Sequence, residues 1–243
     1  MEILEKSLIK TSVILGIFLI IGVSIISFSL YQIKAADNSL SVTGSAKQAV
    51  TADIVKWHGS FSRTVYSSNL KTGYAQMKID EAAVLKFLKD NGVTDEEITV
   101  SSISMQEQYN YNKTASAPTE YSLVQNVIVQ STDIQKVKNI SKSTQTVIDQ
   151  GVIFSAYSPE YYYSKLPEMR VTLLPEAMKD AQNRAASIAA STGKKVGTLK
   201  SASMGVVQVM QPNSIDISDY GNYDVSTVEK EIMITVKASF SLK

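Results

Sequence analysis

Hydrophobic residues follow three different spacings along the chain, and the first is an unbroken apolar run near the N-terminus. Residues 11–33 carry no charge and lie between Lys10 and Lys34. At 1.5 Å per residue they would form a helix of roughly 35 Å, enough to cross a hydrocarbon core of about 30 Å. We expect a transmembrane signal anchor whose membrane-facing side chains are Val13, Ile14, Leu15, Ile17, Phe18, Leu19, Ile20, Ile21, Val23, Ile25 and Ile26.

Two other interpretations of this segment stay open. A cleaved secretory signal normally has a shorter apolar region, of about 7 to 15 residues, followed by small residues at the cleavage site. Ser27-Phe28-Ser29 would satisfy the second condition. A buried core helix would have to hide apolar side chains on all of its sides.

Charges flanking the apolar run predict its orientation. Lys6 and Lys10 precede it and Lys34 follows it, a weak positive-inside bias that places the N-terminus in the cytoplasm. We therefore expect a short N-terminal tail (1–10), the anchor (11–33), a linker (34–39) and an extracytoplasmic domain (40–243). The domain would be secreted if the signal were cleaved.

The domain alternates between strand and helix spacing. Apolar residues at every second position predict strands, and apolar residues at every third or fourth position predict helices. The predicted strands are 40–45, 54–66, 98–111, 121–131, 151–163, 196–210 and 228–242, and the predicted helices are 69–90, 133–149 and 167–192. Proline disrupts a helix interior, so the third helix is expected to bend or restart at Pro175. This order indicates an α+β fold with helices packed on antiparallel or mixed sheets.

A strand-helix-strand-strand order occurs twice in this sequence of elements. It begins at Ile54 and again at Gly151, and the glycines that end the two helices, Gly92 and Gly193, occupy matching places. We interpret 54–131 and 151–242 as possible sub-repeats that are joined by a connector helix at 133–149.

Composition excludes several classes of chemistry. The chain has 24 Lys and Arg against 23 Asp and Glu, and this balance gives no long-range attraction to nucleic acid. The absence of cysteine excludes a catalytic thiol, a disulfide and a thiolate metal site. His58 is the only histidine, and Ser60 and Ser62 on the same strand face lie too far away for a nucleophile–base pair. We predict no catalytic residue, no cofactor and no metal.

Two acidic clusters are interpreted as solvated turns rather than sites. Asp90 and Asp95 to Glu97 lack the spacing of a calcium loop. A second cluster, Asp216, Asp219 and Asp224, lies in the polar loop 211–226, where weak cation binding is the alternative.

Aromatic residues are the best candidates for contacts with partners. Tyrosine offers a large contact area at a low entropic cost. The candidate interaction residues are Trp57, Tyr109, Tyr111, Tyr161, Tyr162, Tyr163, Tyr220 and Tyr223. The alternative is that they are ordinary strand and edge residues.

Several local strings, taken in order, resemble the SIMPL-domain family, which includes YggE-type periplasmic proteins. They include Val42-Thr43-Gly44, Val50-Thr51-Ala52-Asp53, Tyr109-Asn110-Tyr111, and the alanine-rich helix from Glu176 to Ala189. Thr51-Ala52 departs from the pattern, which usually has proline there. The resemblance covers nearly the whole of 40–242 and implies an exported α+β domain, often linked to envelope or oxidative stress, that in some members assembles into rings. It brings no established catalytic residue.

These observations support a membrane-anchored, extracytoplasmic and non-enzymatic protein that assembles with copies of itself as an envelope or stress-related scaffold. The expected partners are the lipid bilayer and further copies of the chain, with no nucleic acid. The alternative is a receptor for a small extracellular ligand or a cell-wall fragment, with Trp57 and the tyrosines stacking on sugar rings. A third possibility, a carboxylate hydrolase, would need two acids about 5 to 10 Å apart across a cleft.

Overall fold

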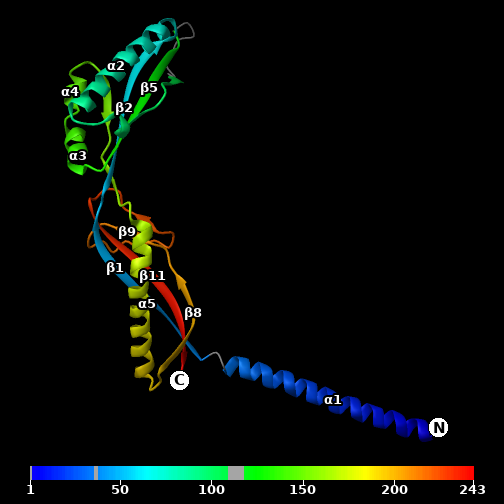
Figure 1. Cartoon of the computed structure of the whole chain (residues 1–243). Coiled ribbons are helices and arrows are strands. Elements are labelled where there is room, and N and C mark those ends of the chain that lie inside the picture. The colour runs from blue at the N-terminus through cyan, green and yellow to red at the C-terminus, as the bar shows by residue number, and fades with distance from the viewer. Residues whose placement is uncertain (1, 36–37, 109–117) are drawn as a thin grey trace. The chain divides into compact units, whose positions relative to one another are not determined.

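The structure is a computed structural model that describes residues 2–35, 38–108 and 118–243, and it has the predicted α+β class (Figure 1). Its first helix, α1 (Glu2–Ala35), contains an apolar window at Val13–Gln32 with a mean hydropathy of 2.7. None of that window is buried against the rest of the chain. The prediction of an N-terminal apolar helix long enough to cross a membrane is therefore confirmed.

The chain divides into two compact units, each assembled from separate segments. Unit 1 comprises Met1–Ala46, Leu174–Gly205 and Thr235–Lys243, and unit 2 comprises Lys47–Leu173 and Val206–Ile234. The strands of the described residues form two sheets. Sheet A has the order β1-β11-β9-β10 with β8 also paired to β11, and sheet B has the order β3-β5-β2-β6 with β4 paired to β5 and β7 to β2.

Sheet B of unit 2 is built on one long antiparallel pair. β2 (Ile54–Tyr66) and β5 (Glu120–Ser131) pair from Val55↔Ser131 to Tyr66↔Glu120. β3 (Ile98–Val100) and β4 (Ser104–Glu107) pair with the other edge of β5, and β6 (Ile153–Ala156) and β7 (Glu160–Tyr162) pair with the other edge of β2. Every strand pair in this sheet is antiparallel.

Helices cover one face of sheet B. α2 (Leu70–Asp90) and α3 (Ile134–Lys142) lie along the β2–β5 pair (Figure 1), and α4 (Gln145–Ile148) lies beside α2 and β6. In the sequence, the short 3-10 helices η1 (Ser67–Asn69) and η2 (Asp95–Glu97) flank α2. The core between these layers contains Val55, Trp57 and Phe61, as the alternation along β2 predicts. The polar residues that alternate with them consequently lie on the opposite face.

Unit 1 packs a helix against part of sheet A. β1 (Ser39–Thr51) adjoins β11 (Glu229–Leu242), and residues 236–242 of β11 pair with β8 (Val196–Met204). α5 (Leu166–Ser191) covers this sheet through four buried alanines, Ala177, Ala181, Ala185 and Ala189. A Cβ at Gly44 would lie only 2.2 Å from the backbone oxygen of Ala177, so β1 and α5 can approach this closely only because Gly44 has no side chain.

Several predicted elements are divided where the chain makes long-range contacts. Strand 98–111 breaks after β3, where Ser101 N donates to Asn126 O. Strand 151–163 breaks after β6, where Tyr157 N donates to His58 O. Strand 196–210 becomes β8 and β9 (Gln208–Met210) around Gly205, and the connector helix 133–149 becomes α3 and α4. Residues 222–223 form the additional short strand β10 (Asn222–Tyr223), which pairs parallel to β9.

Other boundaries also differ from the sequence-based expectation. β1 extends to Thr51 rather than ending at Ser45, because it continues beside β11. α5 passes through Pro175 as one helix and does not restart there. The helix tolerates the loss of one backbone donor at this proline. The buried alanines of α5 all lie in turns that follow Pro175.

Sub-repeats 54–131 and 151–242 do not correspond to the two compact units. β6 and β7, the first strands of the second sub-repeat, belong to sheet B because they pair with β2. The reason is local packing: Gly59 leaves a space that the Phe154 ring fills, and a Cβ there would lie 2.4 Å from Phe154 Cζ. A common origin of the two halves stays a prediction.

Candidate functional site

The face of sheet B opposite the helices is polar and partly exposed along β2. It presents Lys56, His58, Ser60 and Ser62 from β2, as the alternating pattern predicts. Across from His58 and Ser60, β5 places Ile128 and Asn126. A sheet face of this composition is free to meet solvent or a ligand.

A hollow of about 490 Å³ opens on this face. Its lining includes His58, Ser101, Asn126, Ile128, Tyr157 and Glu160. Two strand interruptions shape it, one between β3 and β4 at Ser101 and the other between β6 and β7 at Tyr157. The hollow therefore exists where the sequence-based strands were expected to be continuous.

Tyr157 is held at the rim by its backbone. Its N–H donates to His58 O (3.0 Å), and its carbonyl oxygen accepts a hydrogen bond from Trp57 Nε1 (3.0 Å). Trp57 is fully buried and its ring packs 5.9 Å, centroid to centroid, from that of Phe154. A rigid core residue thus fixes the backbone of a tyrosine that remains 60% exposed.

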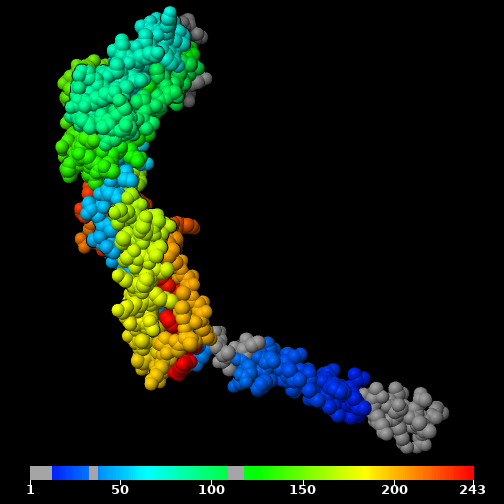
Figure 2. Space-filling model, in the orientation of Figure 1, coloured from blue at the N-terminus to red at the C-terminus, as the bar shows by residue number. Residues whose placement is uncertain are grey.

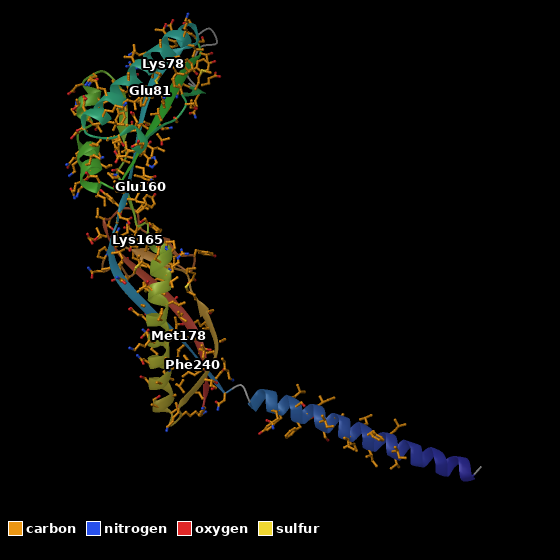
Figure 3. All side chains as sticks on the ribbon, viewed as in Figure 1. Lys78, Glu81, Glu160, Lys165, Met178 and Phe240 are labelled. Carbon is orange, nitrogen blue, oxygen red and sulfur yellow. The ribbon has the colours of Figure 1, made fainter. Side chains whose placement is uncertain are left out.

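Glu160 is the acidic group of the hollow (labelled in Figure 3). Its Oε2 atom accepts a hydrogen bond from the Tyr162 hydroxyl (2.6 Å) and lies 3.9 Å from His58 Nε2. This hydrogen bond, with burial and the Glu160 charge, raises the pKa of Tyr162 to about 12. Lys56 Nζ lies 5.3 Å from the centre of the Tyr162 ring, so a cation stands beside the carboxylate.

The aromatic residues that the sequence analysis proposed as partner contacts differ in their burial and contacts. Trp57 and Tyr161 are buried in the core of unit 2, and their role as partner contacts stays a prediction. Tyr162 and Tyr223 pack against each other with ring centroids 5.8 Å apart, and Tyr223 Oη accepts a hydrogen bond from Tyr163 N (2.9 Å). Tyr220 is 96% exposed. Tyr109 and Tyr111 lie outside the described residues.

Loop 211–221 carries apolar residues that the sequence analysis missed by treating the segment as polar. Ile215 is 90% exposed and Ile217 is 66% exposed, close in sequence to Tyr220. The base of the loop is fixed, since Gln208 Nε2 donates to Ser218 O (2.6 Å) and Gly221 N donates to Ser218 O (3.1 Å). The sequence feature that could have identified these exposed residues is the presence of isoleucine in a loop that has neither strand nor helix spacing.

Asp224 has a structural role rather than a place in a cation site. Its carboxylate accepts hydrogen bonds from Ser226 and Thr227 and pairs with Lys230, whose side chain is fully buried. Burial opposes ionisation, but these hydrogen bonds outweigh it and hold the pKa of Asp224 well below its usual value. Burial lowers the pKa of Lys230, and the Asp224 carboxylate offsets part of that effect.

The acidic turn before β3 is also neutralised by neighbours. Asp90 pairs with Lys86, Asp95 with Lys89, and Glu97 with Lys136. Among the residues that the structure describes, no group of three or more His, Asp or Glu side chains is placed to hold a metal ion. The arrangement is that of ordinary ion pairs.

Unit 1 contains an apolar groove of about 380 Å³ between α5 and β8. Leu174 and Met178 line it from α5, Ala202 and Met204 from β8, and Val236 of β11 forms its floor. Figure 2 shows β11 between these two elements. Met178 also packs against the buried cluster that contains Phe240 (both labelled in Figure 3). The sequence pattern gave no indication of this groove.

Comparison with protein families identifies the domain. Residues 40–240 match the family model SIMPL, described as a protein of unknown function (DUF541). The chain belongs to the SIMPL family. In this SIMPL domain Ala52 N donates a hydrogen bond to Val228 O (2.9 Å). Proline has no N–H and would lack this bond, so the replacement of the usual proline by Thr51-Ala52 adds one backbone hydrogen bond.

Other comparisons add no function to the SIMPL assignment. No curated protein matches the sequence. Two Staphylococcus aureus structures resemble parts of the chain: one from a methicillin-resistant strain, named as an aminohydrolase (14% identity, TM-score 0.26, 50% of this chain and 31% of that one), and a tripeptidase (11% identity, TM-score 0.24, 76% and 39%). The chain spans well under half the length of either protein, and likeness at this level supports no argument about activity.

Proposed function

We propose that this SIMPL protein is a membrane-anchored, extracytoplasmic and non-enzymatic interaction module that assembles with copies of itself in the cell envelope. The observation that carries the proposal is the exposed apolar loop of Ile215, Ile217 and Tyr220. The helix Val13–Gln32 supports the anchoring, and the family resemblance suggests a role under envelope stress.

The loop has the properties of an interface anchor. Large apolar and aromatic side chains contribute most of the binding energy of protein interfaces when they become fully desolvated. Here two isoleucines and a tyrosine are exposed on a loop whose base is fixed by hydrogen bonds, so little ordering cost would be added on binding. Anchoring in one membrane would also raise the effective concentration of the copies.

The test is the mass of the full chain in detergent micelles, measured by native mass spectrometry and light scattering at micromolar concentration. We expect an oligomer, and we expect the triple variant I215S/I217S/Y220S to shift it toward monomer by at least tenfold in dissociation constant. The control is I79S, which removes a 61% exposed isoleucine from α2 and should leave the mass unchanged. A strictly monomeric chain, or equal dissociation of both variants, would count against self-assembly through this loop.

A further inference from the structure

We propose that the hollow on the open face of sheet B binds a neutral oligosaccharide, with Tyr157 as the stacking surface. This inference is independent of the loop 211–221 and of self-assembly, because it concerns a different part of unit 2. Three observations support it: the exposed ring of Tyr157, the polar groups around it and the balance of charge in the hollow.

The first observation is that the residue Tyr157 is exposed on a fixed backbone. It is 60% exposed, while the backbone on either side is fixed by Trp57 Nε1 and His58 O at 3.0 Å each. Stacking of a sugar ring on an aromatic ring uses the apolar C–H face of the sugar, and because the backbone of Tyr157 is already fixed, only its side-chain torsions need ordering when a sugar binds. The hollow, at about 490 Å³, lies within the usual volume range of small-molecule sites.

The second observation is the set of hydrogen-bonding groups. Asn126 offers a carboxamide that has no hydrogen-bond partner among the residues in the structure's described ranges. Glu160 offers acceptor oxygens, and His58 offers ring nitrogens. Sugar hydroxyls act as both donors and acceptors, so a carboxamide can donate to them and accept from them, a carboxylate can accept from them, and an imidazole can donate or accept.

The third observation concerns charge. The Glu160 carboxylate would repel an anionic ligand. A small cation is also disfavoured, because the Lys56 ammonium opposite Glu160 in the β2–β7 pair would repel it. Tyr157 alone also does not form the cage of several aromatic rings that binds organic cations. A neutral ligand with hydroxyl groups and an apolar face remains the best match.

The experiment titrates the full chain in detergent micelles with tri-N-acetylchitotriose and cellotriose, using isothermal calorimetry and saturation-transfer difference NMR. We expect millimolar to micromolar binding of at least one of these sugars, with saturation transfer to sugar ring protons. Y157A should weaken binding by at least tenfold, Y157F should retain it, and N126A should weaken it by threefold or more.

The matched control is Y74A, which removes a 37% exposed tyrosine from α2 in the layer that covers the other face of sheet B, and it should leave binding unchanged. Retained emission of the single tryptophan, Trp57, shows that each variant is folded. Binding of neither sugar at 10 mM, equal binding by wild type and folded Y157A, or binding of tetramethylammonium in their place would overturn the proposal. None of these outcomes bears on the oligomeric mass, so the two proposals fail separately.

Discussion

At Glu97, several donors converge on one carboxylate. Thr94 N donates to Oε2 (2.9 Å), and Lys136 Nζ contacts both oxygens at 3.0 and 2.9 Å. Burial alone would raise the pKa of Glu97, but hydrogen bonds from Ser131, Lys136 and the Thr94 backbone outweigh it and lower the pKa to about 2. Because the folded-state pKa lies below the ordinary value of 4.5, Glu97 stabilises the fold above pH 4.5, and this contribution is lost as the pH falls toward 2.

We therefore expect E97Q to lower the free energy of unfolding at pH 7 by roughly 2 to 3 kcal/mol. The variant should also lose less stability than wild type between pH 4.5 and pH 2. Thermal unfolding followed by Trp57 fluorescence across this range measures both effects. E96Q alters an exposed neighbouring carboxylate and serves as the control, and equal pH profiles for wild type and E97Q would contradict the assignment.

At the scale of elements, α5 depends on small side chains for its packing. Ala181 is fully buried against sheet A, and a Cβ at Gly44 of β1 would lie 2.3 Å from Ala181 N. A181L would force β1 and α5 apart, and we expect it to lower the free energy of unfolding by about 1 to 3 kcal/mol because the added carbons overpack the layer. Chemical denaturation of the full chain in micelles measures the difference.

A matched control lies on the same helix. A190L makes the same chemical change at an exposed position of α5 and should alter stability by no more than about 0.5 kcal/mol. Equal destabilisation by the two variants would mean that helix propensity, rather than the close approach of β1, determines the result.

At the scale of the whole molecule, the apolar helix Val13–Gln32 is long enough to cross a membrane, and the proposed anchoring of the SIMPL domain rests on it. Arginine near the centre of a membrane helix costs roughly 2.5 to 3.5 kcal/mol. The double variant I20R/V23R should therefore move much of the protein out of the carbonate-resistant membrane fraction. I79R/V171R places two arginines at exposed positions of the domain and should leave the protein in that fraction.

Intact mass of the membrane-bound chain separates an anchor from a cleaved signal. A product that retains residues 1–34 agrees with the anchor, and a product that begins after Ser29 contradicts it. Protease added outside spheroplasts should digest the domain but leave residues 1–10 protected, as the positive-inside bias predicts.

Local spacing in the sequence was enough to predict those features that depend on near neighbours. Alternation along 54–66 predicted a strand, which puts Val55, Trp57 and Phe61 on one face because side chains on a strand change face at every residue, and the structure buries that face. Repetition every fourth residue predicted the alanine stripe of α5, and the absence of charge at 11–33 predicted α1. These features need no information about which distant segment lies opposite.

Only the tertiary structure decided which distant segments meet. Gly59 and Phe154 are far apart in sequence, yet their packing assigns β6 to sheet B and, with the hydrogen bond from Trp57 to Tyr157, forms the hollow. Lys230 is buried, against the usual preference of lysine, because it forms an ion pair with Asp224. Ile215 is exposed, against the usual preference of isoleucine, on a loop whose base is fixed by a hydrogen bond. Such pairings result from contacts between residues that are distant in sequence. For that reason the sequence alone determined the apolar N-terminal helix and the faces of the elements but not the site.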